Sequence, residues 1–317
     1  MSINNLCKNE VYYIVIDLTL LGSGGSMPIP SRFLSSLLIC YRGKKILVDC
    51  GEGTQVSMKI ANTGFKAIDV ICITHTHADH IAGLPGLLGT IGNSGRIEPL
   101  TIIGPNGIKE AVDGLMVIAK YLPYEVNVIE ASNDEFLFID DLVSINTLKL
   151  DHSSPCLGYS FYFKRNPKFS VEKAQVNNVP KILWSKLQKS KGNIEFEGKV
   201  YRKDMVLGEE REGIKVTFVT DTRPIDSIKK FINHSNLHFS DGTYGDDLDI
   251  EKAVKNKHMT FREAAIVARK GNVEKLVLTH LGTSLLNPED YIENAREEFE
   301  NTILGEDGLK FKLNFNN

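Results

Sequence analysis

The feature that most constrains the fold of this chain is a cluster of four potential metal ligands, His75-Thr76-His77-Ala78-Asp79-His80. The cluster directly follows Val70–Thr74, an apolar run with the length and composition of a short buried strand. Alternate side chains of an extended segment point the same way, so the first two histidines can share one metal. A turn into a helix then directs the aspartate and the third histidine towards a second position. Imidazole suits Zn²⁺ and a carboxylate compensates charge, so the pattern predicts a metal site at a strand end.

A second metal needs ligands from other parts of the chain, and three further apolar runs end in residues that can supply them. These residues are His152, Asp221 and His280, and each follows a strand-like segment. An α/β scaffold places its sites at the carboxyl ends of strands. Together with the cluster, these three side chains supply enough ligands for two metals, with Asp221 as the bridge between them.

The order of the secondary-structure patterns indicates a layered α/β fold. The first part of the chain is rich in strands, including a hairpin formed by Leu37–Tyr41 and Lys45–Asp49. In the last third, strand and helix patterns alternate. The periodicity predicts single helices over Asp79–Gly92 and Pro288–Glu300. Each half predicts a sheet with helices outside, so we expect residues 1–317 to form a single domain, a four-layer αβ/βα sandwich.

A basic segment between Lys164 and Lys203 interrupts this order of strand and helix patterns. It holds eleven Lys and Arg residues and three acids, a net charge of +8, whereas the whole chain carries −3 and the remainder therefore −11. Counterion release makes such a concentration of positive charge attractive to RNA. The alternative is a solvated loop with surplus lysines. We expect a basic arm inserted at about residues 164–208.

The cysteines and the N-terminal region indicate a cytoplasmic protein. The five cysteines are scattered and contain no CxxC pair, which is typical of a reducing compartment. The first residues lack the pattern of a signal peptide. The apolar run Val11–Leu21 contains Asp17 and is too short to span a bilayer, so we expect no membrane association.

Several motifs resemble those of one family. His75–His80 resembles the HxHxDH signature of the metallo-β-lactamase superfamily, and Asp49–Gln55, which reads DCGEGTQ, is similar to the sequence that ribonuclease Z proteins carry at that place. The resemblance covers nearly the whole chain, from about Leu18 to Leu285. Its further matches are Gly22–Pro28, Asp221–Pro224, Leu278–His280 and Lys168–Leu187.

The resemblance implies a metallo-β-lactamase fold and two Zn²⁺ per chain, with Mn²⁺ as a possible substitute. It implies a first zinc bound by His75, His77, His152 and Asp221, and a second bound by Asp79, His80, Asp221 and His280. Asp49 resembles a residue that orients the cluster without binding metal.

The activity that the resemblance implies is removal of the 3′ trailer from tRNA precursors. Two zinc ions lower the pKa of a bridging water and neutralise charge on the phosphoryl oxygens, and the resulting hydroxide attacks the phosphodiester. Asp79 would accept or orient the proton of this nucleophile. The family is commonly dimeric, so the resemblance also implies a homodimer in which the arm of one subunit serves tRNA bound at the other.

The sequence departs from the family where the leaving oxygen needs a proton. Ribonuclease Z proteins carry a HEAT motif whose acid cooperates with a later histidine, but the matching stretch here is Ser240-Asp241-Gly242-Thr243. The later histidine matches His258. We therefore expect an Asp241–His258 pair in which His258 donates the proton. The alternative is a histidine near a helix N-terminus without a catalytic role.

The candidate RNA contacts are less specific than the candidate metal ligands. Arg32 lies in a segment that resembles a loop contacting the tRNA end, although a surface arginine is the alternative. Ile182–Ser185 stands where the family's arm is rich in glycine and proline, and Leu281–Ser284 lacks an Arg-Tyr pair found in many relatives. The remaining candidates are lysines of the arm: Lys168, Lys173, Lys181, Lys186 and Lys189.

Two other functions compete with this hypothesis. One is a phosphodiesterase of the same superfamily that acts on cyclic nucleotides or small phosphodiesters, although the basic segment favours a polymer. The other is a non-catalytic RNA-binding protein with a vestigial site. The presence of every expected metal ligand argues against the second alternative.

Overall fold

The computed structural model describes residues 15–190 and 192–315. The chain separates into two compact units: a main unit, made of the residues up to Tyr162 and from Lys215 onwards, and a small unit, Phe163–Ile214. Cys7 and Lys191 lie outside the described residues. Four cysteines of the described part, Cys40, Cys50, Cys72 and Cys156, are free.

The first sheet of the main unit has seven strands in the order β16-β1-β2-β3-β4-β5-β6. Its neighbours are antiparallel from β16 to β3 and parallel from β3 to β6. The strands are β1 (Val15–Gly22), β2 (Ser36–Tyr41), β3 (Lys44–Val48), β4 (Ile68–Cys72), β5 (Leu100–Gly104), β6 (Val126–Glu130) and β16 (Lys310–Asn314).

The second sheet has seven strands in the order β15-β14-β13-β12-β9-β8-β7, and β12 to β15 run parallel. Because parallel neighbours end at the same edge, the residues that follow β12, β13 and β14 are brought together. The strands are β7 (Phe136–Asp140), β8 (Val143–Lys149), β9 (Leu157–Arg165), β12 (Arg211–Val219), β13 (Leu237–Asp241), β14 (Leu276–Thr279) and β15 (Thr302–Leu304).

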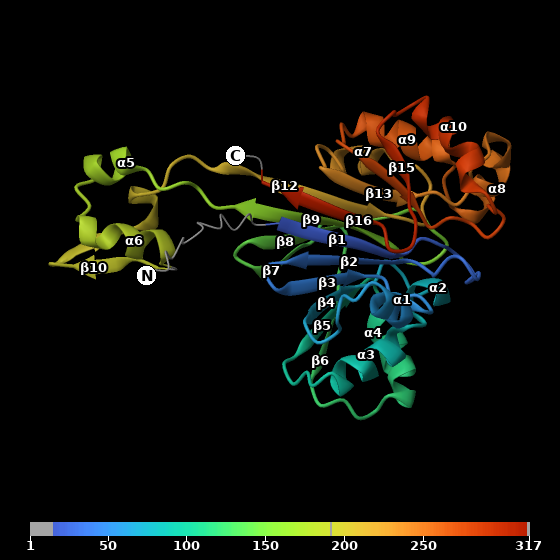
Figure 1. Ribbon diagram of the computed structural model, residues 1–317, viewed down its shortest axis with the longest axis horizontal. Coiled ribbons are helices and arrows are strands. Elements are labelled where there is room, and N and C mark those ends of the chain that lie inside the picture. Colours follow the sequence, from blue (N-terminus) through green and yellow to red (C-terminus); the bar gives the residue numbers. More distant parts are fainter. Residues whose placement is uncertain (1–14, 191, 316–317) are drawn as a thin grey trace, which may run out of the picture. The chain divides into compact units, whose positions relative to one another are not determined.

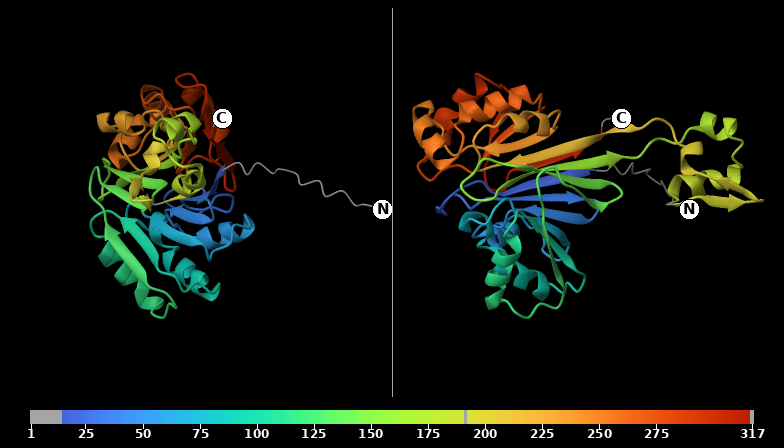
Figure 2. Two further views of the ribbon diagram at one scale, coloured as in Figure 1. Left: turned by 90° about the vertical axis from the view of Figure 1, so that its left-hand side faces the viewer. Right: turned by 180° about the vertical axis from the view of Figure 1, so that it is seen from behind.

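Helices cover the outer face of each sheet (Figures 1 and 2). On the first sheet, Leu87 of a helix packs in one buried cluster with Ile71 of β4, and on the second, Phe261 and Ile228 share a cluster with Leu276 of β14. The predicted four-layer αβ/βα sandwich is therefore confirmed. The helices are α1 (Thr54–Ile60), α2 (Ala78–Ile81), α3 (Leu84–Asn93), α4 (Ile108–Leu115), α7 (Asp226–Phe231), α8 (Ile250–Asn256), α9 (Phe261–Lys270) and α10 (Ile292–Arg296), with short 3₁₀ turns at Met116–Ile118, Asp247–Asp249 and Pro288–Tyr291.

Two helices predicted as continuous are broken in the structure. The helix expected over Asp79–Gly92 is divided into α2 and α3 around Gly83, whose N–H donates to the carbonyl of Cys50 at 2.9 Å. A Cβ on Gly83 would lie 2.2 Å from the carbonyl oxygen of Gly51, so the helix is interrupted where the chain passes closely over this loop. The expected helix Pro288–Glu300 is a 3₁₀ turn followed by the short α10.

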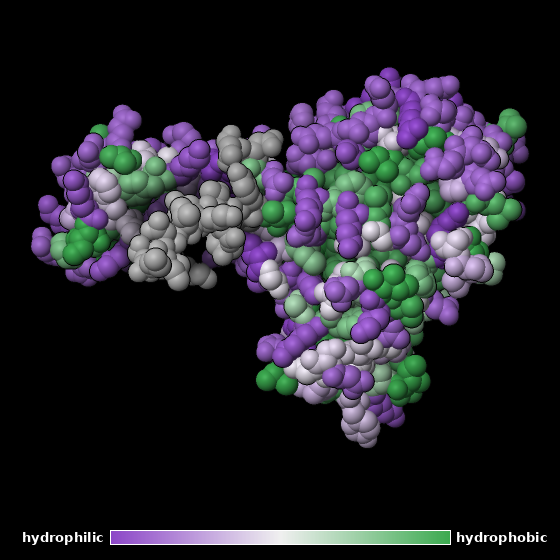
Figure 3. Space-filling model, viewed as in Figure 1, coloured by the Kyte–Doolittle hydropathy of each residue, from purple (hydrophilic) through white to green (hydrophobic). Residues whose placement is uncertain are grey.

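The small unit has its own core. Helices α5 (Val171–Val176) and α6 (Lys181–Lys189) pack with the hairpin of β10 (Ile194–Phe196) and β11 (Lys199–Tyr201) and with a 3₁₀ turn, Lys203–Met205. Leu183 and Leu187 of α6 are buried in this core. The whole unit contains twelve Lys and Arg and seven acids, a net charge of +5, and hydrophilic side chains cover much of its visible face (Figure 3). None of the helices in the described ranges is long and apolar enough to cross a membrane.

Candidate metal centre

The structure brings all seven candidate ligands together at the carboxyl ends of strands. The cluster His75–His80 follows β4, and its last part forms the start of α2 after an extended residue at His77 (φ −66°, ψ 150°). His152 follows β8, Asp221 follows β12, and His280 follows β14. His152, Asp221 and His280 therefore each follow a strand, as the sequence predicted, and lie at one edge of the second sheet.

Among the described residues, potential ligand atoms form four overlapping sets in which they lie no more than 4.8 Å apart. Two sets contain Asp221, one with His75 and His80 and the other with Asp241, His258 and His280. The remaining two sets share no residue and are called here the first and second groups. The first group is His75, His77 and His152, in which Nδ1 of His77 lies 3.0 Å from Nε2 of His75 and 3.3 Å from Nε2 of His152. The second group is Asp79, His80 and His280. Oδ2 of Asp79 lies 3.5 Å from Nε2 of His80 and 3.3 Å from Nε2 of His280.

Asp221 lies between the two groups. Its Oδ2 is 3.8 Å from Nε2 of His75 and 3.3 Å from Nε2 of His280, and its Oδ1 is 3.5 Å from Nε2 of His80. Burial raises the pKa of this carboxyl, but the surrounding imidazoles of His280, His80 and His75 lower it more, so the net pKa lies well below the ordinary value. A carboxylate in this position can contact a cation in either group.

Two buried atoms at the centre lack hydrogen-bond partners among the described residues: Nε2 of His80 and Oδ1 of Asp221. These two atoms lie 3.5 Å from each other, and a buried polar atom without a hydrogen bond costs about 1–3 kcal/mol. A cation coordinated by both atoms would remove that cost. Because the donors are imidazole nitrogens and carboxylate oxygens, which suit Zn²⁺, the residues present fit a pair of zinc ions.

Three residues of the centre have a left-handed backbone. The φ angles of Asp49, Asp221 and His280 are 58°, 54° and 55°, and each residue comes just after a strand. A non-glycine residue held there costs about 1–3 kcal/mol and persists only where its surroundings fix it. The same sharp reversal at three strand ends turns polar side chains back towards the common edge.

Asp49 is fully buried and holds the imidazole of His80. Its Oδ1 accepts from the N–H of Thr74 at 2.7 Å, and its Oδ2 accepts from the Thr74 hydroxyl at 2.9 Å and lies 2.7 Å from Nδ1 of His80. Burial lowers the pKa of His80, but Asp221 and Asp49 raise it more, and the net pKa lies well above the ordinary value. With Nδ1 engaged by Asp49, Nε2 is the nitrogen left for a metal.

Asp241 and His258 form a close pair beside the second group. Oδ2 of Asp241 lies 2.8 Å from Nδ1 of His258, and its Oδ1 accepts from the N–H of Thr243 at 2.9 Å. Burial lowers the pKa of His258, but Asp241 raises it more, to about 9. The guanidinium of Arg223 donates to the backbone carbonyl of His258 and pairs with Glu263, which fixes the loop that carries this histidine.

Three contacts at the centre were not predicted from the sequence. The hydroxyl of Thr243 lies 3.0 Å from Nδ1 of His280, and the hydroxyl of Thr74 lies 3.1 Å from Nδ1 of His75. The N–H of Ser26 donates to Oδ2 of Asp79 at 2.7 Å. Thr74 directly precedes the candidate ligand His75, and Thr243 lies two residues after Asp241, whereas nothing local distinguishes Ser26.

The centre opens into a cavity of about 410 Å³. Its walls include candidate ligands, His258, and four residues outside the predicted site: Ser26, Ser153, Lys255 and Asn256. Lys255 and Asn256 lie at the end of α8 and are exposed. The cavity therefore combines candidate metal ligands with a cation and an amide that can contact an anionic substrate.

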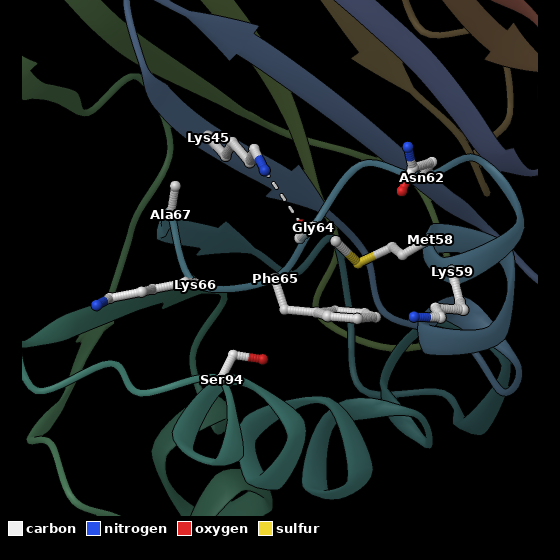
Figure 4. A pocket seen from close by; sticks show the side chains of 9 residues that line it. All are labelled: Lys45, Met58, Lys59, Asn62, Gly64, Phe65, Lys66, Ala67 and Ser94. Atoms are coloured by element: carbon white, nitrogen blue, oxygen red, sulfur yellow. Dashed lines mark hydrogen bonds between the residues drawn. The ribbon is translucent and has the colours of Figure 1, made fainter.

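A second cavity, of about 380 Å³, lies at the other end of the same strands (Figure 4). Its lining includes Lys45 near the start of β3 and Phe65 just before β4, whereas Asp49 and His75 follow the ends of these strands. The ammonium of Lys45 donates to the carbonyl of Gly64 at 3.1 Å, as Figure 4 shows. This lysine thus ties the loop between α1 and β4 to the sheet, away from the metal centre.

The candidate RNA contacts differ in exposure. Arg32 is only 9% exposed, and its guanidinium donates to the carbonyls of Gly282 and Leu285. In the small unit, Lys173 pairs with Glu209 at 3.5 Å. The exposed candidates of that unit are Lys168, Lys181, Lys186 and Lys189.

Solved structures with the same fold identify the class to which this protein belongs. The structure superposes on human tRNase Z, short form (ELAC1), with a TM-score of 0.66 at 25% identity, over 93% of this chain and 98% of that chain. It superposes on the metallo-beta-lactamase fold protein YhfI from Bacillus subtilis with a TM-score of 0.69 at 19% identity, over 94% of this chain and 100% of that chain. The protein is a metal-dependent hydrolase with the metallo-β-lactamase fold.

Sequence comparison identifies the family within this class. A family model described as "Anti-Pycsar protein Apyc1" matches residues 16–112. The chain is 63% identical over 306 residues to ribonuclease Z of Clostridium beijerinckii, with 95% of this chain and 99% of that protein covered. It is 57% identical over 304 residues to ribonuclease Z of Clostridioides difficile, with 95% of this chain and 99% of that protein covered. The chain belongs to the ribonuclease Z family.

Proposed function

We propose that this protein is an endonuclease that removes the 3′ trailer from tRNA precursors, cutting after the discriminator nucleotide. The observation that carries the proposal is the convergence of all seven candidate ligands on two groups, in a chain 63% identical to a ribonuclease Z over nearly its full length. The products would be a tRNA with a 3′-hydroxyl and a trailer with a 5′-phosphate.

The candidate ligands would hold two Zn²⁺, or Mn²⁺ in their place. One ion would be bound by His75, His77 and His152. The other ion would be bound by Asp79, His80 and His280. Asp221 would bind both ions. Bound there, two such ions lower the pKa of a water and neutralise charge on the phosphoryl oxygens. Asp79 would take or orient the proton of the attacking water, and the N–H of Ser26 holds Oδ2 of this carboxylate in place.

His258 would donate a proton to the leaving 3′-oxygen. Its Nδ1 is engaged by Asp241 at 2.8 Å, and its ring lines the cavity, so Nε2 is the nitrogen left for the substrate. Asp241 stabilises the protonated ring by its buried negative charge. This pair would replace the longer acid of the HEAT motif.

The small unit would bind the tRNA body. Its exposed lysines on α6, Lys181, Lys186 and Lys189, together with Lys168 and Lys173, would contact phosphates. Arg32 would act on the tRNA end through the loop it fixes, because its guanidinium donates to two backbone carbonyls.

We further infer a homodimer in the cytoplasm. A second subunit would allow the arm of one chain to bind tRNA whose cleavage site lies at the other chain. Sedimentation of the purified protein tests the dimer, because it measures the mass of the particle in solution. The free thiols of Cys40, Cys50, Cys72 and Cys156 suit a reducing compartment.

The experiment compares a 3′-extended tRNA precursor with bis(p-nitrophenyl) phosphate, a small phosphodiester, as substrates of the zinc-loaded protein. A variant in which Lys181, Lys186 and Lys189 are all changed to Gln tests the arm. A matched control changes Lys229, Lys230 and Lys270, exposed lysines of α7 and α9, to Gln.

We expect the arm variant alone to lose kcat/KM on the precursor. Its plot of log kcat/KM against log salt should also be shallower, by about one for each phosphate that the arm no longer binds. Hydrolysis of the small substrate should be unchanged in both variants. Hydrolysis of the small phosphodiester without precursor cleavage by the unmodified protein would instead select the superfamily phosphodiesterase.

A further inference from the structure

One carboxylate outside the predicted site holds both ends of a loop that reaches the metal centre. Asp307 lies in the turn between β15 and β16, where the chain passes from the second sheet to the first. Its Oδ1 accepts from the N–H of Ser23 at 2.9 Å and from the Ser23 hydroxyl at 2.8 Å, and its Oδ2 accepts from the N–H of Phe33 at 2.6 Å. Ser23 and Phe33 are the two ends of one glycine-rich loop, which we call the 23–33 loop.

The 23–33 loop contacts two candidate ligands of the same group. The N–H of Ser26 donates to Oδ2 of Asp79 at 2.7 Å. The imidazole of His280 lies directly on Gly25, where an added Cβ would be 2.3–2.6 Å from three ring atoms. The N–H of Gly25 also donates to the carbonyl of Leu281 at 3.1 Å. A shift of the loop would therefore move the surroundings of Asp79 and His280 together.

The other group of ligands is positioned by different elements. His75 and His77 follow β4, and His152 follows β8. Thr74, next to His75, is held by Asp49 through its N–H and its hydroxyl. Because these supports do not pass through the 23–33 loop, a change in the loop should affect the two groups unequally.

The contacts of Asp307 are strong enough to set the position of the loop. Three donors share one partly buried carboxylate, and hydrogen bonds to an ionised acceptor are about twice as strong as neutral ones. Arg32 of the same loop donates to the carbonyls of Gly282 and Leu285, which ties the loop to the segment after His280. The loop is thus fixed at both ends and along its length.

We propose that Asp307 is a positioning residue that fixes the 23–33 loop against Asp79 and His280 and so selectively sets the affinity of the metal position they form. This inference rests on the proposed two-metal site. Asp307 touches neither a candidate ligand nor the cavity, so its effect passes through Ser23, Phe33 and Ser26.

The test is the zinc affinity of Asp307→Asn, measured by competition with a chromogenic chelator that resolves the two binding steps. The matched control is Glu306→Gln, which removes the neighbouring exposed carboxylate. We expect Asp307→Asn to keep one zinc with the affinity of the unmodified protein and to bind the other about 10–100-fold more weakly. Both affinities should be unchanged in Glu306→Gln.

Other outcomes overturn the inference or the function separately. Two unchanged affinities in a destabilised Asp307→Asn protein would show a purely structural residue, as would equal weakening of both sites. If the unmodified protein binds fewer than two zinc ions, the proposed two-metal function itself fails. Should Asp307→Asn not fold, Ser23→Ala, which removes only the hydroxyl donor, must weaken the same single site to a smaller extent, and no weakening there would also overturn the inference.

Discussion

The carboxylate of Asp49 lies 2.7 Å from Nδ1 of His80, while Nε2 of the same ring lies 3.5 Å from Oδ1 of Asp221. One imidazole thus connects a residue that binds no metal in our proposal to the residue that would bind both. Asp49 is itself fixed by Thr74, which directly precedes the cluster. The orientation of His80 therefore depends on a group behind the ring.

The substitution Asp49→Asn should weaken zinc binding without removing a ligand. The amide would keep the shape of the side chain but would not carry the negative charge that holds His80. We expect zinc affinity and kcat/KM each to fall about 10–100-fold, which is the usual effect of losing such a partner. Zinc titration and precursor cleavage measure the two quantities, and unchanged zinc affinity would contradict the orienting role.

Replacement of His258 by Asn should affect only substrates whose leaving group needs a proton. On a tRNA precursor, where an alkoxide must be protonated, we expect kcat to fall about 10²–10⁴-fold. On bis(p-nitrophenyl) phosphate, whose nitrophenolate leaves unprotonated, kcat should change little. Equal losses on both substrates, with zinc content intact, would show that His258 is not the proton donor.

His238 should make the stability of the fold depend on pH in the acid range. This side chain is fully buried on β13, with Nδ1 2.9 Å from the Thr217 hydroxyl and Nε2 without a partner among the described residues. Burial lowers its pKa from 6.5 to about 3. Below pH 6.5 His238 binds a proton in the unfolded chain, whereas the buried ring stays neutral in the folded chain until the pH approaches 3. The contribution of neutral His238 to the free energy of unfolding is therefore complete above pH 6.5 and is lost as the pH falls towards 3.

The variant His238→Asn removes this titration. As the pH falls from 6.5, the free energy of unfolding of the unmodified protein should decline more steeply than that of the variant, by up to about 1.4 kcal/mol per pH unit. Urea unfolding at several pH values between 7 and 5, referred to the same zinc-free state, measures the difference. A difference between the two proteins that stays constant with pH would contradict the account.

The candidate metal ligands could be selected from the sequence because each carries a local signal. His152, Asp221 and His280 each follow an apolar run, and the parallel strands β12 to β14 bring the ends that carry Asp221 and His280 to one edge. By contrast, Asp307 reaches Ser23 across 284 residues, and no local pattern indicates a pairing over that distance. Periodicity likewise gave the helix Asp79–Gly92 but not its break, which depends on contact of Gly83 with the Cys50–Gly51 segment.

The edges of the sheets and the charge of the arm were also incompletely predicted. The short strands β15 and β16 were not predicted. The residues of β16 are exposed or half-buried, and this segment is recognised as a strand only because it pairs with β1. The arm is less basic than the segment Lys164–Lys203 suggested, because the small unit extends to Ile214 and includes Glu209, Glu210 and Glu212. Charge counts depend on boundaries that only the tertiary structure defines.

The most direct test of the central claim is to map the product ends when the zinc-loaded protein acts on a 3′-extended tRNA precursor, beside a His77→Ala variant. We expect one cut after the discriminator nucleotide, with a 3′-hydroxyl on the tRNA and a 5′-phosphate on the trailer. The cut should be abolished in His77→Ala. Failure to cut the precursor, or a cut that persists unchanged in His77→Ala, would contradict it.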